Sequence, residues 1–114
     1  MIKVYVAGPI RIGDYAANVR KGIDAGLTLI RAGFAPYIPH TDILARLIDP
    51  VALSEEMCLR LDEEWLLQCD CVLRLPGESI GADREVKFAL QHKIPVFYDI
   101  TKLIAGYNDP LEFY

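Results

Sequence analysis

The sequence predicts a three-layer α/β domain built on a parallel sheet of four or five strands, of the flavodoxin-like or Rossmann-like type. Short apolar runs alternate along the chain with segments of helical periodicity, and this alternation is typical of parallel sheets with right-handed crossovers. The chain has 114 residues, of which 53% are hydrophobic. We therefore expect a single domain, residues 1–114, with one packed core.

Strands are predicted where runs rich in β-branched and aromatic residues end at glycine or proline. These runs are residues 2–7, 34–38, 70–75 and 95–98. Helices are predicted over residues 14–32, 54–68 and 82–92, with a weaker helical turn between 40 and 50 and another after 98. Ser54 can cap the second helix. We expect Ala17, Ile23, Leu27 and Ile30 to share one face of the first helix, and Trp65 to lie in the core.

The charge and hydropathy of the chain limit the kinds of binding partner that we expect. The formal net charge is −4, and no cluster of Lys and Arg is present, so a nucleic-acid polymer is not an expected partner. A small anion remains compatible, because one or two cations and a helix N-terminus are enough to bind it. No apolar run approaches the roughly 20 residues that span a bilayer, and the N-terminus lacks a signal-peptide pattern. No membrane partner is expected.

The three cysteines, Cys58, Cys69 and Cys71, are an odd number without framework spacing. This usage is typical of a reducing compartment, and we expect a cytoplasmic protein. Cys69 and Cys71 have no second cluster to complete a metal site. We interpret them as buried thiols and predict neither a metal nor a cofactor.

In parallel sheets, ligands bind beyond the carboxyl ends of the strands. Four loops are therefore candidates: residues 8–13, from His40 onward, residues 76–82, and from Asp99 onward. In the first loop, Gly8 lets the backbone approach a ligand, and Arg11 can pair with a phosphate or carboxylate. An ordinary turn with a solvated Arg11 explains this loop equally well.

The loop that contains Gly77, Ser79 and Gly81 leaves a predicted strand and enters a helix. Its backbone N–H groups and the Ser79 hydroxyl can hold an anion or a sugar hydroxyl. We place Glu85 in the first turn of the helix, where the dipole favours an ionised carboxylate. Ala82 and Ala89 leave room beside it for nucleophilic or base chemistry. From spacing alone, a glutamate that only complements the dipole is the better explanation.

Asp62 falls on the apolar face of its helix, so its carboxyl group needs a partner or a ligand. A structural hydrogen bond to a loop explains it equally well. Tyr5 shares a strand face with Lys3 and Ala7, and its hydroxyl needs a buried partner, as in an ordinary core tyrosine. His40 follows the second strand, where it either contacts a ligand or merely ends a turn.

Together these residues resemble the nucleoside 2-deoxyribosyltransferase-like superfamily, in particular its small phage and bacterial members and its nucleotide N-glycoside hydrolase branch. The run from Val4 to Pro9 matches the opening motif, Asp62 before the third strand matches a second, and residues 79–85 match the third. The resemblance covers the chain from Val4 to about Tyr98.

The resemblance implies cleavage or transfer of the N-glycosidic bond of a nucleoside or nucleoside 5′-monophosphate. Glu85 would attack the anomeric carbon, Tyr5 would orient Glu85, and Asp62 would hold or protonate the leaving base. Ser79 and Arg11 stand where the hydrolases bind a 5′-phosphate. The remaining predicted binding residues are Gly8, Ile10, His40 and Gly81.

Two alternatives remain open. One is a nucleotide-binding or sensing module without turnover. The other is a phosphoribohydrolase of the cytokinin-activating type, although its longer glycine-rich pattern is absent. The resemblance also implies a homodimer or higher homo-oligomer, and Phe113 and Tyr114 are candidate contacts between subunits.

Overall fold

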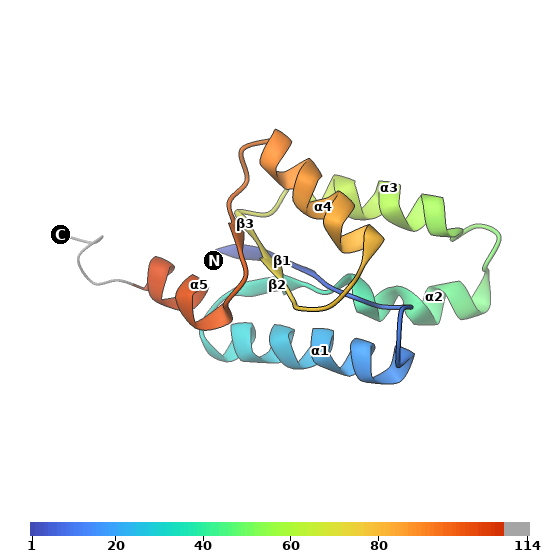
Figure 1. The fold of residues 1–114 in the computed structure, drawn as a ribbon, viewed down its shortest axis with the longest axis horizontal. Helices are drawn as coiled ribbons and strands as arrows, with labels where there is room; N and C mark the ends of the chain where they lie inside the picture. Colours follow the sequence, from blue (N-terminus) through green and yellow to red (C-terminus); the bar gives the residue numbers. More distant parts are fainter. Residues whose placement is uncertain (109–114) are drawn as a thin grey trace.

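A four-stranded parallel sheet forms the centre of the molecule, in a computed structural model that describes residues 1–108 (Figure 1). The strand order is β2-β1-β3-β4. The strands are β1 (Lys3–Ala7), β2 (Ala35–Tyr37), β3 (Cys71–Arg74) and β4 (Val96–Phe97). The α/β class and the parallel sheet are confirmed, with the smaller of the two predicted strand numbers.

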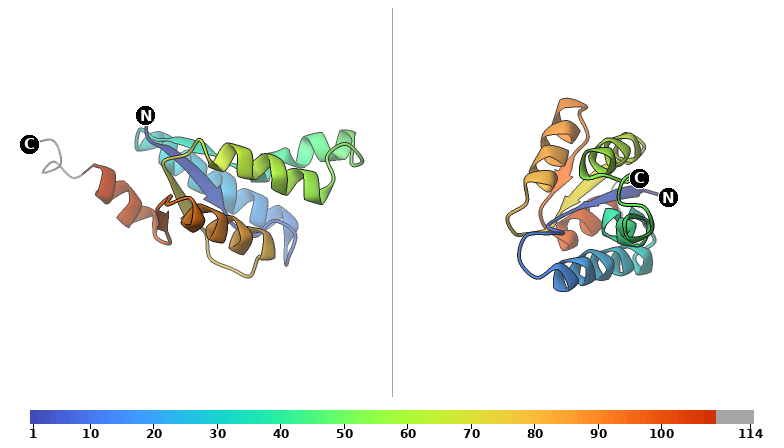
Figure 2. Two further views of the ribbon diagram at one scale, coloured as in Figure 1. Left: turned by 90° about the horizontal axis from the view of Figure 1, so that it is seen from above. Right: turned by 90° about the vertical axis from the view of Figure 1, so that its right-hand side faces the viewer.

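Helices cover both faces of this sheet. They are α1 (Tyr15–Arg31), the 3₁₀ turn η1 (Pro39–Asp42), α2 (Ile43–Ile48), α3 (Glu55–Leu66), α4 (Ile80–Gln91) and α5 (Ile100–Tyr107). α1 and α5 lie on one face, and α3 and α4 lie on the other, as the end-on view shows (Figure 2). The result is the three-layer sandwich that the sequence predicts.

Each face has its own core. The core under α1 and α5 is wholly apolar: Val4, Val6, Leu29, Phe34, Cys71, Leu73 and Leu103. The core under α3 and α4 contains Tyr5, Ala7, Leu66, Val72, Ala82 and Ala89. Because side chains alternate along a strand, β1 supplies Val4 and Val6 to the first core and Tyr5 and Ala7 to the second.

Side chains cap the helices at the positions where the sequence allows it. Ser54 accepts a hydrogen bond from the Met57 amide at 3.2 Å, which confirms the predicted cap of α3. Ser79 accepts one from the Ala82 amide at 3.0 Å. This second cap starts α4 at Ile80, two residues before the predicted position.

The predicted apolar face of α1 is wrong for two of its four residues, whereas Ala17 and Ile23 are half-buried. Leu27 and Ile30 are 42% and 53% exposed, and the buried residues of the helix are Gly22, Gly26 and Leu29. A Cβ atom on Gly22 would lie 2.5 Å from the His40 ring. The helix therefore packs through its backbone, and a search for large apolar residues at helical spacing cannot detect such a face.

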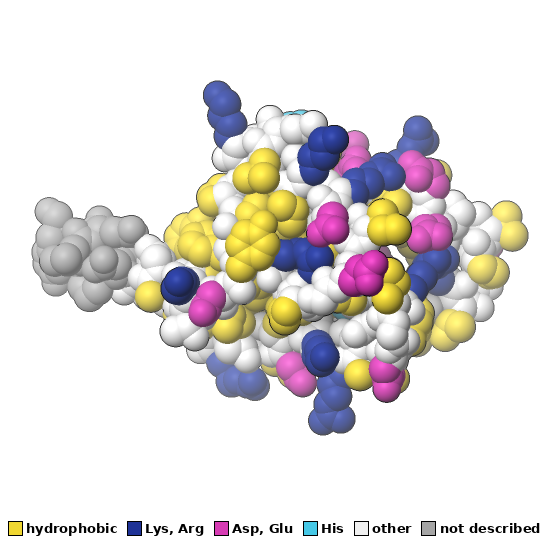
Figure 3. Space-filling model, in the orientation of Figure 1, with side chains coloured by type: hydrophobic (Ala, Val, Ile, Leu, Met, Phe, Trp, Pro, Cys, Tyr) yellow, Lys and Arg dark blue, Asp and Glu magenta, His cyan; other side chains and the backbone are white. Residues whose placement is uncertain are grey.

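Trp65 is also not a core residue, because its side chain is 54% exposed. One face of its ring stacks on Tyr37, with the ring centroids 5.8 Å apart, and this contact alone does not bury it. Charged side chains of both signs are interspersed on the face that Figure 3 shows. Within residues 1–108, no helix is long and apolar enough to cross a membrane. The predicted contacts Phe113 and Tyr114 lie outside the described residues.

Candidate functional site

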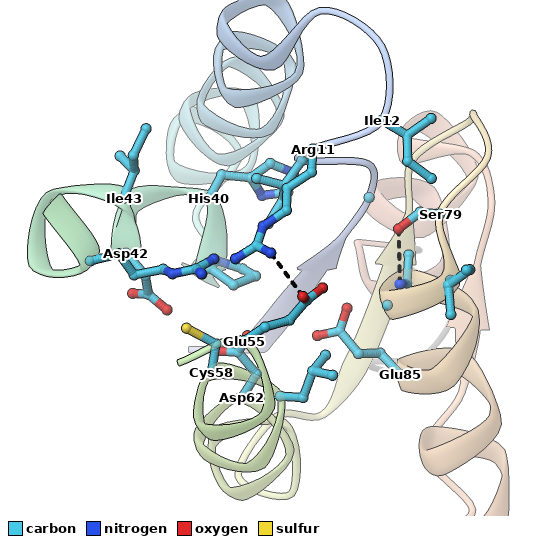
Figure 4. A pocket seen from close by; sticks show the side chains of 18 of the residues that line it. Arg11, Ile12, His40, Asp42, Ile43, Glu55, Cys58, Asp62, Ser79 and Glu85 are labelled. Carbon is cyan, nitrogen blue, oxygen red and sulfur yellow. Dashed lines mark hydrogen bonds and ion pairs between the residues drawn. The ribbon is translucent and has the colours of Figure 1, made fainter. Parts of the chain in front are cut away.

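A cavity of about 200 Å³ opens at the carboxyl edge of the sheet. Three of the four predicted loops line it, together with α3, whereas the loop after β4 does not. The lining residues are Gly8, Ile10, Arg11, Ile12, Tyr15, Pro39, His40, Asp42, Ile43, Arg46, Glu55, Cys58, Leu59, Asp62, Ser79, Ile80, Gly81, Ala82 and Glu85. Glu85 and Asp62, which come from α4 and α3, thus share one cavity (Figure 4).

Glu85 is 6% exposed, and the hydroxyl of Tyr5 donates a hydrogen bond to its carboxylate. Tyr5 is fully buried in the middle of β1, next to Tyr37 on β2 and Val72 on β3. A donor on a central strand cannot move far, so it fixes one carboxylate oxygen of Glu85. Tyr5 and Glu85 are 80 positions apart, so no local pattern of the sequence predicts their contact. Only the family resemblance predicts it.

The expected first-turn position of Glu85 is wrong. Since α4 begins at Ile80, Glu85 is in the second turn, and the acidic residue of the first turn is Asp83. The helix dipole acts mainly within one turn of the terminus, whereas burial is the largest influence on Glu85. Burial raises the pKa of Glu85 to about 8, and the hydrogen bond from Tyr5 partly opposes the shift. The predicted small neighbours, Ala82 and Ala89, are both buried.

Asp62 is 7% exposed and accepts a hydrogen bond from the Tyr37 hydroxyl at 3.4 Å. The carboxyl group of Asp42 also acts on it from the turn after β2. Burial, followed by the charge of Asp42, raises the pKa of Asp62 to about 7. Burial also raises the pKa of Asp42. With a pKa of about 7, Asp62 keeps a proton in a large share of molecules near neutral pH, so it is a candidate acid.

The residues Ser79, Ile80 and Gly81, where the loop after β3 enters α4, line the cavity, and Figure 4 shows Ser79 at its edge. Ser79 is buried, and its oxygen caps the Ala82 amide. The N–H groups of the first turn of a helix have no partners within that helix. With the Ser79 hydroxyl, they can bind an anion or a sugar hydroxyl, as the sequence predicts.

Arg11 reaches across the cavity from the loop after β1 to α3. Its guanidinium lies 2.9 Å from the carboxylate of Glu55 (Figure 4). Both side chains are partly exposed, and ion pairs of this kind contribute only about 0–1 kcal/mol. Arg11 can therefore exchange Glu55 for an anionic ligand at little cost.

The sequence from residue 2 to residue 99 matches the model of a family described as a domain of unknown function (DUF7768). The chain belongs to this family. The matched segment contains every residue that lines the cavity. A comparison with curated proteins finds no match.

His40 lines the cavity of this DUF7768 domain but is 1% exposed. Its ring packs against Gly22 of α1. Neither ring nitrogen makes a well-formed hydrogen bond with the described residues. Burial lowers the pKa of His40, and the nearby Pro9 backbone partly opposes this effect. His40 is therefore neutral, and its buried ring forms part of the cavity wall beside the loop after β1.

Two residues of the site were missed at the sequence level, Tyr37 and Asp42. Tyr37 lies on β2 beside Tyr5, with the ring centroids 5.5 Å apart, and contacts Asp62. Asp42 follows His40 in the same predicted loop. The end of a parallel strand is a known place for ligand-binding residues, and this signal applies to Asp42 as well as to His40.

The described residues contain no group of three or more His, Cys, Asp or Glu side chains that could hold a metal ion. Cys58 lines the cavity, Cys71 is buried, and Cys69 is half-buried. The groups of the cavity that suit acid and nucleophile chemistry are thus carboxyls: Glu85 with a fixed orientation, and Asp62 with a raised pKa.

Proposed function

We propose that this protein cleaves, or transfers, the N-glycosidic bond of a nucleoside or nucleoside 5′-monophosphate, with Glu85 as the nucleophile. The observation that carries the proposal is the buried Glu85 carboxylate, oriented by Tyr5, in one cavity with Asp62. Cleavage of an N-glycosidic bond passes through an oxocarbenium-like state, which a nearby carboxylate stabilises.

In the first step, an oxygen of ionised Glu85 forms a bond to the anomeric carbon as the bond from that carbon to the base breaks. Asp62 donates its proton to the leaving base nitrogen, so the base departs neutral. In the second step, water or a second base attacks the anomeric carbon, and the sugar–Glu85 bond breaks. Asp62 takes the proton of the attacking molecule, and the enzyme returns to its starting state.

The pKa values of the two carboxyl groups set the pH range. Glu85, with a pKa of about 8, has to be ionised, whereas Asp62, with a pKa of about 7, has to be protonated. At pH 7.5, the site holds one proton between the two groups, and about a tenth of these molecules carry it on Asp62. The rate should follow a bell-shaped pH profile with its maximum between 7 and 8.

The remaining residues of the cavity suit the rest of the substrate. The N-terminus of α4 and Ser79 would hold the 5′ group, and Arg11 would leave Glu55 to pair with a 5′-phosphate. Gly8 and Ile10 would line the sugar, and Asp42 would accept hydrogen bonds from the base. We infer a cytoplasmic homo-oligomer as the setting, in keeping with the resemblance.

The proposal is tested by incubating the purified protein with a panel of ribo- and deoxyribonucleosides and their 5′-monophosphates. Released base is measured by chromatography, with and without a second base as acceptor. We expect release from at least one substrate, and its loss in Glu85→Gln but not in Glu64→Gln, which makes the same change on an exposed part of α3. Full release by Glu85→Gln would exclude the nucleophile, and tight nucleotide binding without any release would instead indicate a sensing module.

A further inference from the structure

Arg74 is a buried cation at the carboxyl end of β3, next to the candidate site but outside the lining of its cavity. It is 8% exposed and pairs in register with Ala7 of β1. It lies on the sheet face that α4 covers, since it reaches Asp83 of that helix. A buried arginine needs partners for its charge and its donors, and these partners show what it does.

The guanidinium of Arg74 connects three consecutive pieces of the chain. It donates hydrogen bonds to the carbonyl of Leu75, to the carbonyl of Gly77 at 2.9 Å, and to the carboxylate of Asp83 at 3.0 Å. These partners belong to the end of β3, the loop after it, and the first turn of α4. Ser79 lies between the second and the third.

The loop that Arg74 holds is conformationally unusual. Gly77 has a φ of +115°, and a Cβ atom there would lie 2.8 Å from the Pro9 side chain. The loop after β3 is thus pressed against the loop after β1, the one that carries Arg11. The two loops that carry Arg11 and Ser79 therefore meet at Gly77, whose carbonyl accepts a hydrogen bond from Arg74.

We propose that Arg74 is a positioning residue, which holds the loop 75–79 and the first turn of α4 so that Ser79 and Glu85 face the substrate. This inference rests on the proposed function for its catalytic part. Lysine cannot take over all three contacts, because the guanidinium fork directs donors along several fixed directions and the ammonium group is a single point.

Arg74 has a second influence on Glu85, through its charge. Four groups facing Glu85 act on its pKa besides burial. The hydrogen bond from Tyr5 and the charge of Arg74 lower it, whereas the charges of Asp62 and Glu63 raise it. Removal of Arg74 should therefore make Glu85 harder to ionise. Because Glu85 has the higher pKa of the two carboxyl groups, the maximal rate should fall and the alkaline limb of the pH profile should move to higher pH.

Hydrogen exchange measured by mass spectrometry tests the loop directly and needs no substrate. We expect Arg74→Met to speed amide exchange in residues 76–82 by about tenfold or more, and to leave α1 unchanged. The matched control, Asp83→Asn, removes only the exposed partner and should change exchange by less than about threefold. Unchanged exchange in Arg74→Met would overturn the proposal.

Kinetics on a substrate that the wild type cleaves separates the two influences of Arg74. Arg74→Met should raise KM about tenfold and shift the alkaline limb to higher pH, whereas Arg74→Lys should restore the limb but not KM. An Arg74→Met variant with wild-type KM and an unshifted limb would contradict the proposal. If Arg74→Met does not fold, Arg74→Lys still decides it, because wild-type exchange in residues 76–82 would exclude a need for the guanidinium. If the wild type cleaves nothing, the proposed function fails, and the exchange result stands alone.

Discussion

The two faces of the sheet differ in what they bury. Under α1 and α5 the core consists of apolar side chains, from Val4 to Leu103, and the buried His40 ring packs against α1 beside it. Under α3 and α4 the sheet also covers Tyr5, Asp62, Arg74 and Glu85, all less than 9% exposed. The first face suits stability, since apolar burial drives folding. The second face buries carboxyl groups away from water, and this burial lowers the stability of the fold. Such a cost is typical of residues that a function requires.

Glu85→Gln should produce the largest contrast, because it changes activity and stability in opposite directions. The folded state raises the pKa of Glu85 from 4.5 to about 8, so the free energy of unfolding falls as pH rises through this interval. Glutamine cannot ionise, and the variant should be more stable than wild type by ~2 kcal/mol or more at pH 8.5, and little changed at pH 4.5. Base release should fall about 10³-fold or more.

Urea unfolding at the two pH values, together with the release assay, measures both effects. Glu64→Gln on the exposed side of α3 is the control and should change neither. A Glu85→Gln variant that is less stable than wild type at pH 8.5 would mean that this carboxylate stabilises the fold rather than burdening it.

Leu29→Ala, on the face covered by α1 and α5, should lower stability and leave activity nearly unchanged. Leu29 is fully buried, and its truncation should lower the free energy of unfolding by about 3 kcal/mol. The turnover number of the folded protein should remain within about twofold of wild type, because Leu29 is near the C-terminal end of α1 and does not line the cavity. Leu27→Ala, two residues along α1 and 42% exposed, is the control. Equal losses in the two variants would contradict the assignment of the core.

Tyr5→Phe removes one hydrogen bond at the centre of the polar face. The bond lowers the pKa of Glu85, so its loss should raise this pKa and shift the alkaline limb of the pH profile to higher pH. It should also reduce turnover at pH 7 by about 10–100-fold. Tyr98→Phe, at a 69% exposed position, should behave as wild type. A normal profile in Tyr5→Phe would show that Glu85 is oriented without it.

Asp42→Asn should have the smallest effect, and it should depend on pH. The charge of Asp42 raises the pKa of Asp62, so the variant should lose the proton of Asp62 at lower pH. Activity should fall about 3–10-fold at pH 8 and change little at pH 6. The exposed Asp24→Asn on α1 is the control. An acid limb that does not move to lower pH would remove Asp42 from the account.

The sequence could predict the fold because the fold depends on local signals. Alternating apolar runs and helical periods located all four strands within two residues of their observed limits. The packing of α1 through Gly22 could not be predicted, since it depends on the His40 ring from another element. The exposure of Trp65 likewise depends on which neighbours leave one face of its ring uncovered.

The candidate site was predictable where the signal lay within one element, as for Asp62 on an apolar helix face. The pairing of Tyr5 with Glu85 joins residues 80 positions apart, and spacing alone contains no trace of it. The pKa of Glu85 was misjudged for a related reason. The sequence places the start of α4 two residues too late, so Glu85 is expected in the first turn with its pKa set by the helix dipole. In the structure Glu85 is in the second turn, and burial has the largest influence on its pKa.

The central claim is that the Glu85 carboxylate forms a bond to the substrate, and its most direct test is to find that bond. The protein is mixed with a nucleoside or nucleotide from which it releases base, quenched in acid within the first turnover, digested, and mapped by mass spectrometry. We predict a peptide that contains Glu85 and carries the mass of the sugar moiety, and its absence in Glu85→Gln. A sugar adduct on another residue, or full base release by Glu85→Gln, would contradict the account.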